Sequence, residues 1–481
     1  MRHPPAYLRT LGAAELATLI RERRVRSREV VDAHLAHLRR VNPRLNALVA
    51  ERFAAAREEA EAADAAADAG VDLGPLHGVP CTIKECFALE GMPWTAGLVA
   101  RKDVRAETDA TAVARLRAAG AIPLGVTNVS ELCMWMETHN RLYGRTRNPY
   151  DASRIVGGSS GGEGALVGAG ATPFGLGSDV GGSIRMPAFF NGVFGHKPTG
   201  GLVPNTGQYP ATDTPDALRY LTTGPLARRA ADLPLLLRVL AGPDGRCAGA
   251  RELPWVDPAE VDVGALRVLD VPFDGVTPVH PALQAAQARA ASGLEALGAR
   301  VEQPRLDALR HGLEIWSAML GHANQVSFAA RLGQGEPIGV GRELLRWVFG
   351  RSPHTLPALG LAALEPVERL LPRRAAAMRS RGAALREELE ARLGDDGVML
   401  YPSYAEPAPK HGAPLVPPTR WVYTALINVL ELPATQVPLG LDARGLPLGV
   451  QVVAARGRDH LTLAVARALE KLFGGWIAPR P

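Results

Sequence analysis

The sequence has little lysine. It contains 54 Lys and Arg residues, yet only five of them are lysines, at the positions Lys84, Lys102, Lys197, Lys410 and Lys471. Arginine cannot lose its proton in a protein, whereas a buried lysine can act as a base. A chain so rich in arginine is expected to keep lysine where arginine cannot serve, and the lysine that precedes a glutamate in the motif GVPCTIKE is the strongest candidate. We interpret Lys102, Lys410 and Lys471 as scattered residues without such a role.

Cysteine is also scarce, and no long apolar run is present. The four cysteines, at positions 81, 86, 133 and 247, include no CxxC pair, which fits reduced thiols in a cytosolic protein. No run of 18 uncharged apolar residues occurs, and no apolar signal segment follows Met1. We therefore expect a cytoplasmic protein without a membrane anchor.

The basic charge is not concentrated. The net charge is +5, but arginines alternate with acids along the chain, so nucleic acid is not an expected partner. Hydrophobic residues make up 47% and charged residues 21%, as in folded proteins with a large core. Length alone favours two or three domains. Because repeats and low-complexity linkers are absent, we instead predict one α/β domain over residues 1–481.

Hydrophobic periodicity predicts alternating helices and strands. Residues 11–67 are expected to be helical, with Ser27 as an N-cap, and residues 79–83 form a short strand that ends at Lys84. A helix at 108–120 followed by a strand at 121–126 is typical of βαβ units. Further helices are predicted at 233–240, 281–297, within 304–395 and at 459–473, and further strands at 266–271, 299–303, 398–402, 434–439 and 448–454.

Two histidines three residues apart, His34 and His37, lie on one predicted helix. Such a pair can bind a metal only with further ligands, and no third ligand lies nearby. We therefore predict no metal site.

The stretch 157–201 contains two serine clusters surrounded by glycines. Ser159 and Ser160 lie in GGSSGG, and Ser183 lies in GSDVGGSIRMPA. Glycine has no Cβ, so these loops can adopt positive φ and bring backbone N–H groups close to a ligand. A nucleophile beside its own hydrogen-bond donors is the expected use.

These motifs, followed by GHKPT, resemble the amidase signature family, serine hydrolases that use a Ser-Ser-Lys triad and no histidine. The likeness continues in GVPCTIKE, TNVSE, YGRTRNPYD and LPLGVQVVA, and so spans most of the chain. The GEGAL continuation after GGSSG and the segment MPAFFNGVFGHKP are similar to the fatty acid amide hydrolases, particularly the second type.

The resemblance implies a fold and a catalytic site. The fold is α/β, with a mixed central β-sheet flanked by helices on both faces. Ser183 is the nucleophile, Ser159 the bridging serine and Lys84 the base, and the peptide bond before Ser159 is cis. The oxyanion hole consists of the N–H groups of Val180, Gly181, Gly182 and Ser183. No cofactor is implied.

The expected substrate is a small-molecule amide with a hydrophobic acyl or aryl group, with esters and carbamates (urethanes) as extensions. Cys133, Met134, Met136 and Ser160 are candidate substrate-binding residues, because Met supplies adaptable apolar surface. Within the single domain we distinguish an N-terminal helical segment at 1–70, catalytic motifs at 78–201, a helical insertion at 304–395 that caps the substrate entrance, and a C-terminal part of the core at 396–481. Asp179 and Arg185 are interpreted as a scaffold ion pair and Lys197 as structural, and a homodimer is left open.

Four other functions are alternatives to amide hydrolysis by this triad. GxSxG occurs twice at 157–162, as in α/β-hydrolases, but no later Asp and His stand in a distinctive context. Phosphate binding lacks the GxxxxGK[ST] motif. A silent scaffold conflicts with keeping a lysine and two serines together in a buried site. The fourth is the glutamine-hydrolysing A subunit of a tRNA-dependent amidotransferase, which works with partner subunits.

Overall fold

The structure is a computed structural model that describes residues 4–71, 74–212, 214–324, 326–369 and 371–480. Residues 1–3 of the predicted N-terminal segment, residues 325 and 370 of the predicted insertion, and residue 481 lie outside the described residues.

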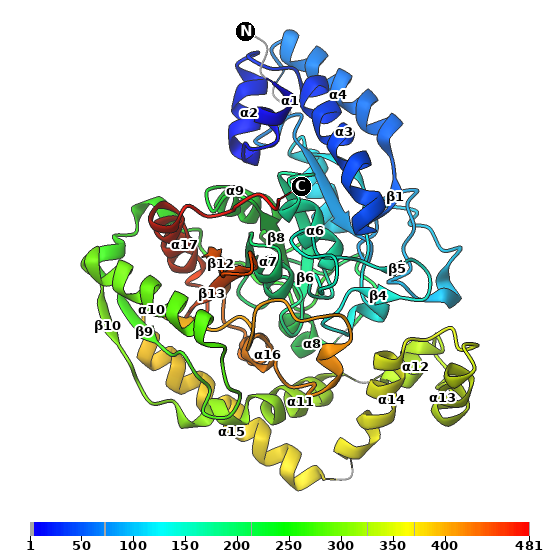
Figure 1. Ribbon diagram of the computed structural model, residues 1–481, viewed down its shortest axis with the longest axis vertical. Coiled ribbons are helices and arrows are strands. Elements are labelled where there is room, and N and C mark those ends of the chain that lie inside the picture. Colours follow the sequence, from blue (N-terminus) through cyan, green and yellow to red (C-terminus); the bar gives the residue numbers. More distant parts are fainter. Residues whose placement is uncertain (1–3, 72–73, 213, 325, 370, 481) are drawn as a thin grey trace.

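Within these described ranges, eleven strands form one mixed sheet with the order β1-β3-β2-β6-β8-β7-β12-β13-β11-β9-β10 (Figure 1). β2 pairs in parallel with β3 and β6, and β9 pairs in parallel with β10 and β11, while the other pairs are antiparallel. The α/β class and the mixed sheet are thereby confirmed. The strands are β1 (Leu48–Glu51), β2 (Pro80–Lys84), β3 (Ile122–Thr127), β6 (Phe174–Asp179), β7 (Phe194–Lys197), β8 (Thr222–Ala227), β9 (Arg267–Asp270), β10 (Arg300–Glu302), β11 (Gly397–Tyr401), β12 (Ala434–Leu441) and β13 (Pro447–Ala454), and the separate pair is β4 (His139–Asn140) with β5 (Gly144–Arg145).

The central strands are covered on both faces. Every residue of β2, β3, β6 and β8 is buried. A strand that is buried on both faces needs a helix layer on each side of the sheet, which accounts for the flanking helices in Figure 1. The helices of this part of the chain are α5 (Thr111–Ala118), α6 (Gly161–Gly168), α7 (Arg185–Phe190), α8 (Pro215–Tyr220), α9 (Asp232–Leu240), α10 (Pro281–Ala296), α16 (Val422–Val429) and α17 (Asp459–Phe473).

The N-terminal segment was predicted to be helical, but it also contributes a strand. Helices α1 (Pro5–Leu8), α2 (Ala13–Arg21) and α3 (Ser27–Leu45) precede β1 in the chain and α4 (Phe53–Asp68) follows it, and β1 pairs antiparallel with β3. The short apolar run after α3 continues the sheet at its edge. It was missed because four residues between two helices give too little periodicity.

Ser27 was predicted to be the N-cap of α3, but it does not cap this helix. It is the first residue of the helix, and its hydroxyl donates to the carbonyl of Gly78 at 2.8 Å. The carboxylate of Asp64 in α4 accepts from the N–H groups of Ser27 and Arg28 instead. A long-range contact thus satisfies the helix terminus that a local cap was predicted to satisfy.

The other predicted elements are confirmed within a few residues, and the predicted helix at 459–473 coincides with α17. β7 and β8 were not predicted. β8 reads TTGPLA, and its glycine and proline are typical of turns, although the strand lies buried between β6 and β7.

The described part of the predicted insertion contains the α-helices α11 (Gly312–Ala323), α12 (Phe328–Leu332), α13 (Val340–Val348), α14 (Leu356–Arg369) and α15 (Pro372–Leu393). α11 and α15 pack together below the sheet in Figure 1, and α12, α13 and α14 form a group at one side. Among the described residues, none of the helices is long and apolar enough to cross a membrane.

We predict that Gly125→Ala destabilises the fold. Gly125 in β3 has φ +151°, and an added Cβ would lie 2.2 Å from the carbonyl oxygen of Ala50 in the adjacent β1. The free energy of unfolding, measured by urea denaturation, should fall by about 2 kcal/mol or more. As a control, Gly341→Ala in α13 meets no atom within 4 Å and should be neutral or slightly stabilising. Equal stability of the two variants would contradict the prediction.

Candidate functional site

Three separate segments meet at the serine motifs. Lys84 ends β2, the turn 157–160 leads into α6, and the loop 180–184 connects β6 to α7. Because β2 and β6 are adjacent and parallel, their carboxyl ends lie at the same edge of the sheet. Ligand sites of α/β sheets form at this edge.

Lys84 and Ser159 are in direct contact. The Nζ atom of Lys84 donates to Ser159 Oγ at 2.8 Å, and both side chains are buried. The peptide bond between Gly158 and Ser159 is cis, as predicted. A hydrogen bond therefore joins two of the three residues predicted for the triad.

Ser178 is a second hydrogen-bond partner of Lys84, and it was not predicted from the sequence. Its Oγ lies 2.9 Å from Lys84 Nζ. Its backbone carbonyl also accepts from Ser160 Oγ at 3.2 Å. Ser178 was not among the predicted site residues, and its position at the end of β6, the neighbour of β2, is the signal that could have found it.

Ser183 lies next to this pair and reaches the surface of a pocket. Its backbone carbonyl accepts from the N–H of Ser160 at 3.2 Å, which joins the two serine loops. Only 6% of Ser183 is exposed, and that part lines the pocket described below. The triad candidates Lys84, Ser159 and Ser183 therefore occupy one site.

The loop predicted to bind the oxyanion is held from several sides. Trp316 Nε1 donates to the carbonyl of Val180, and Thr424 Oγ1 donates to that of Gly181. The N–H of Gly182 donates to Asp179 Oδ1 at 2.6 Å. Of the four predicted donors, Gly182 thus has a protein partner in this structure and would have to exchange it to bind an oxyanion.

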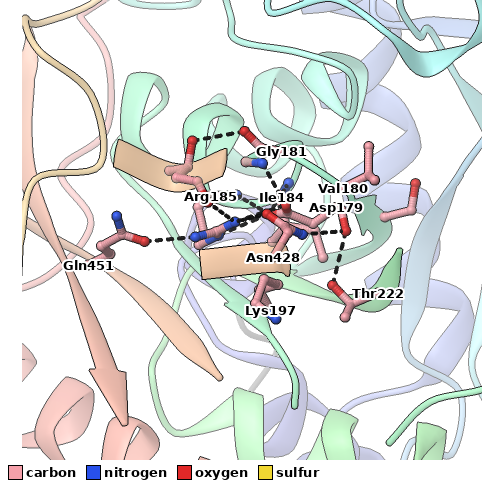
Figure 2. Close-up of polar contacts among 12 residues, drawn as sticks. Asp179, Val180, Gly181, Ile184, Arg185, Lys197, Thr222, Asn428 and Gln451 are labelled. Atoms are coloured by element: carbon pink, nitrogen blue, oxygen red, sulfur yellow. Dashed lines mark hydrogen bonds and ion pairs between the residues drawn. The ribbon is translucent and has the colours of Figure 1, made fainter. Parts of the chain in front are cut away.

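Asp179 and Arg185 form the predicted ion pair, and both side chains are fully buried. Figure 2 shows Arg185 between Asp179, Asn428 and Gln451, with hydrogen bonds of 2.6 Å to Asn428 and 2.8 Å to Gln451. Burial alone would raise the pKa of Asp179, but the charge of Arg185 and its hydrogen bonds outweigh burial and hold the pKa well below its usual range. The pair connects the loop to α16 and β13.

Lys197 lies near this ion pair in β7 and is also buried. Its Nζ donates to the carbonyl of Pro198 at 2.8 Å. Burial, followed by the nearby charge of Arg185, lowers the pKa of Lys197 to about 7. Within the described residues its amine contacts neither Ser159 nor Ser183, which fits the structural role expected for it.

Glu163 of α6 lies behind Lys84. Its carboxyl group accepts from Thr82 of β2 at 2.5 Å and from Thr127 of β3 at 2.8 Å. Burial raises the pKa of Glu163 to about 8, against the hydrogen bonds and the charge of Lys84, which lower it. The carboxyl group of Glu163 therefore holds α6, and the turn 157–160 before it, against the sheet.

An apolar pocket opens beside Ser183. It is lined by Cys133, Met134, Trp135, Met136, Val180, Gly181, Ser183, Met186, Trp316, Leu361 and Trp421. Three of the four candidate substrate-binding residues thus line it. Ser160 does not, because its hydroxyl is directed to Ser178.

Two walls of this pocket come from the helical insertion. Trp316 lies on α11 and Leu361 on α14. The ring of Trp316 meets that of Trp421 edge to face, with 4.6 Å between centroids. Neither Trp316 nor Leu361 was predicted, because single apolar residues on helices carry no distinguishing pattern.

The thiol of Cys133 lies close to the serine–lysine pair. A hydrogen bond with Cys86, together with Lys84 and Ser159, lowers the pKa of Cys133 to about 7 in spite of burial. Cys133 therefore contributes a polarised group to an otherwise apolar wall.

The histidine pair does not form a metal site. His34 and His37 each contact a backbone carbonyl, those of Ala171 and Ala169. Over the described part of the chain, no group of three or more His, Cys, Asp and Glu side chains is placed to hold a metal ion.

The chain belongs to the amidase family. The family description Amidase matches residues 29–463. The chain is 46% identical to fatty-acid amide hydrolase 2-A of Danio rerio, covering 99% of this chain and 92% of that protein. It is also 46% identical to fatty-acid amide hydrolase 2 of Homo sapiens, with 98% and 90% covered. Among solved structures, 6-aminohexanoate cyclic dimer hydrolase with its substrate superimposes with a TM-score of 0.81 at 29% identity, covering 98% of this chain and 99% of that chain.

We predict that Glu163→Gln changes how stability depends on pH. The pKa of Glu163 is raised in the folded protein from 4.5 to about 8. Its contribution to stability is therefore fully present below about pH 4.5 and is lost progressively up to about pH 8, by at most about 1.4 kcal/mol per pH unit. Gln does not titrate, so the variant should lack this loss.

The measurement is urea denaturation of both proteins at several values between pH 5 and pH 8. The stability of Glu163→Gln relative to wild type should rise over this range. Glu388→Gln, a change in an exposed ion pair of α15 with Arg392, is the control and should follow the wild type. A constant difference between Glu163→Gln and wild type at every pH would show that Glu163 is not the titrating group.

Proposed function

We propose that the protein hydrolyses carboxylic amides of hydrophobic acyl or aryl groups through Lys84, Ser159 and Ser183. The observation that carries this proposal is the 2.8 Å hydrogen bond from Lys84 to Ser159, in a buried site one loop away from Ser183. Membership of the amidase family supports the reaction class.

The proposed relay begins at Lys84. An amide needs an activated nucleophile, stabilisation of the oxyanion and a proton for the departing nitrogen. Neutral Lys84 takes a proton from Ser159 as Ser159 takes one from Ser183, and Ser183 Oγ attacks the carbonyl carbon. The same chain then returns the proton to the leaving amine. Water cleaves the resulting acyl-enzyme ester and regenerates Ser183.

The oxyanion would be bound by N–H groups of the loop Val180, Gly181, Gly182 and Ser183. The hydrogen bonds from Trp316 and Thr424 to carbonyls of this loop support the proposal, because they fix the orientation of its peptide groups before substrate arrives. Gly182 has φ +115°, and a Cβ there would lie 2.1 Å from Thr424 Oγ1, so a side chain at this position would disturb the loop.

The apolar pocket supports a hydrophobic acyl or aryl group next to the reacting carbonyl. The names of the two fatty-acid amide hydrolases point to fatty acyl amides. Cys133, Met134 and Met136 are proposed to contact this group. Esters and carbamates (urethanes) share the carbonyl geometry that the loop would stabilise, and we extend the proposal to them.

We predict that the serine-reactive probe methyl arachidonyl fluorophosphonate labels wild type once and does not label Ser183→Ala. Intact mass measures the adduct, and release of p-nitroaniline from an acyl p-nitroanilide measures turnover. Ser153→Ala, a change of an exposed serine, is the matched control and should be labelled like wild type. Labelling of Ser183→Ala would contradict the assignment of the nucleophile.

We predict that Lys84→Arg lowers kcat by about 1000-fold, because arginine keeps the charge but cannot accept the proton of Ser159. The same substitution at the exposed Lys102 is the control and should leave kcat within about twofold. A rate for Lys84→Arg near that of wild type would rule out the relay.

The runner-up is the glutamine-hydrolysing A subunit of an amidotransferase. In that case the purified chain would release ammonia from glutamine only when its partner subunits are added, and would cleave no anilide alone. Turnover of an acyl anilide by the isolated chain excludes both this function and a silent scaffold.

A further inference from the structure

The pocket wall formed by residues 133–136 lies on a loop between two buried glutamates, Glu131 and Glu137. Within this loop, Leu132 and Cys133 have positive φ values of 50° and 60°, which are unfavourable for residues with a Cβ. Such a backbone persists only where neighbouring groups hold it. The two glutamates do so by contacting two distant parts of the chain.

Glu131 contacts the helical insertion. Its Oε1 accepts from His354 Nδ1 at 2.7 Å, and its Oε2 accepts from the N–H of Thr355 at 2.8 Å. Glu131 and His354 are 3% and 5% exposed, so solvent screens this contact little. Since the carboxylate can only accept, the Nδ1 atom of His354 must carry a proton.

This contact fixes the beginning of α14. The helix starts at Leu356, directly after Thr355, and its residue Leu361 lines the pocket of Ser183. The outer side of the same insertion is exposed, as at Leu345, Phe349 and Leu364. The buried contact with Glu131 therefore connects an otherwise peripheral group of helices to the pocket.

Glu137 makes the corresponding contact on the other side. Its Oε1 accepts from His411 Nδ1 at 2.6 Å, and its Oε2 accepts from the N–H of Gly412 at 3.1 Å. The segment after Gly412 leads to Trp421, which lines the same pocket. Two contacts with the same chemistry thus hold different walls against one loop.

We propose that Glu131 and His354 are positioning residues that determine substrate specificity by holding Leu361 of α14 against the acyl pocket. This inference rests on the proposed function. Neither residue touches the reacting atoms. On this proposal a short acyl group contacts fewer of the pocket walls than a long one does, so the long one depends more on the wall that α14 supplies.

The test is the chain-length profile of His354→Ala on p-nitroanilides from acetyl to decanoyl. For the decanoyl substrate, kcat/KM should fall about tenfold, mainly through a higher KM, because binding surface is lost while the serine site is intact. The acetyl substrate should change by less than about twofold. His354→Asn keeps an N–H donor near the position of Nδ1 and should restore part of the decanoyl rate. Glu388→Gln, an exposed change within the insertion, should match wild type.

A double-mutant cycle separates positioning from general damage. Leu361→Ala removes the wall itself, so adding His354→Ala to it should lower kcat/KM for the decanoyl substrate by less than about twofold further. His411→Ala is the matched control, because the same type of contact there holds the opposite wall. Its effect should add to that of Leu361→Ala.

Equal loss for all chain lengths, no loss at all, or additive effects of His354→Ala and Leu361→Ala would each overturn the inference. Hydrogen exchange of residues 356–365 provides a readout that does not need turnover, and exchange there should be faster in His354→Ala than in wild type. If wild type cleaves no anilide, the proposed function has failed. The exchange measurement would then still test the contact. Faster exchange in His354→Ala would show that Glu131 and His354 hold α14, and unchanged exchange would show that they do not.

Discussion

The buried amine of Lys84 is the constraint on which the rest of the site depends. A lysine with no exposed surface costs free energy unless its hydrogen-bonding capacity is used. Ser159, in the turn before α6, and Ser178, at the end of β6, use it, and they meet at the sheet edge where β2 and β6 end side by side. Burying Lys84 in turn requires β2 to be covered on both faces. The two-sided helix layers and the glycines that let loops pack closely therefore follow from the same requirement.

A buried arginine, Arg185, connects the two halves of the chain. Its guanidinium contacts Asp179 at the end of β6, Asn428 in α16 and Gln451 in β13. Removing Asp179 would leave the buried charge of Arg185 uncompensated, which costs about 3–5 kcal/mol. The loop that carries Ser183 thus has its shape only when the C-terminal half is in place, so the sheet and the site form together.

The sequence predicted what depends on local pattern and on motif. The strand ending at Lys84, the helix at 459–473, the cis bond before Ser159 and the Asp179–Arg185 pair were all expected, because each is encoded by residues close together or by a distinctive motif. β1 and β8 were missed, since their pairing partners, not their own periodicity, make them strands. The contact of Ser178 with Lys84 was missed for the same reason, because it depends on which strands are neighbours. The cap on Ser27 was wrong because Asp64, far along the chain, takes that role.

Sequence motifs predict only some of the residues that line the pocket. Cys133, Met134 and Met136 lie just after a recognisable motif and could be predicted, whereas Trp316 and Leu361 come from an insertion without one. The groups proposed for chemistry are held by the buried sheet edge, but the walls are held by Glu131 and Glu137 through contacts with segments more than 200 residues away. A change in the insertion can therefore alter the size of the pocket without moving Lys84 or Ser159. If the proposed roles hold, reaction type and substrate choice rest on different parts of the chain, and proteins with the same serine loops can differ in what they bind.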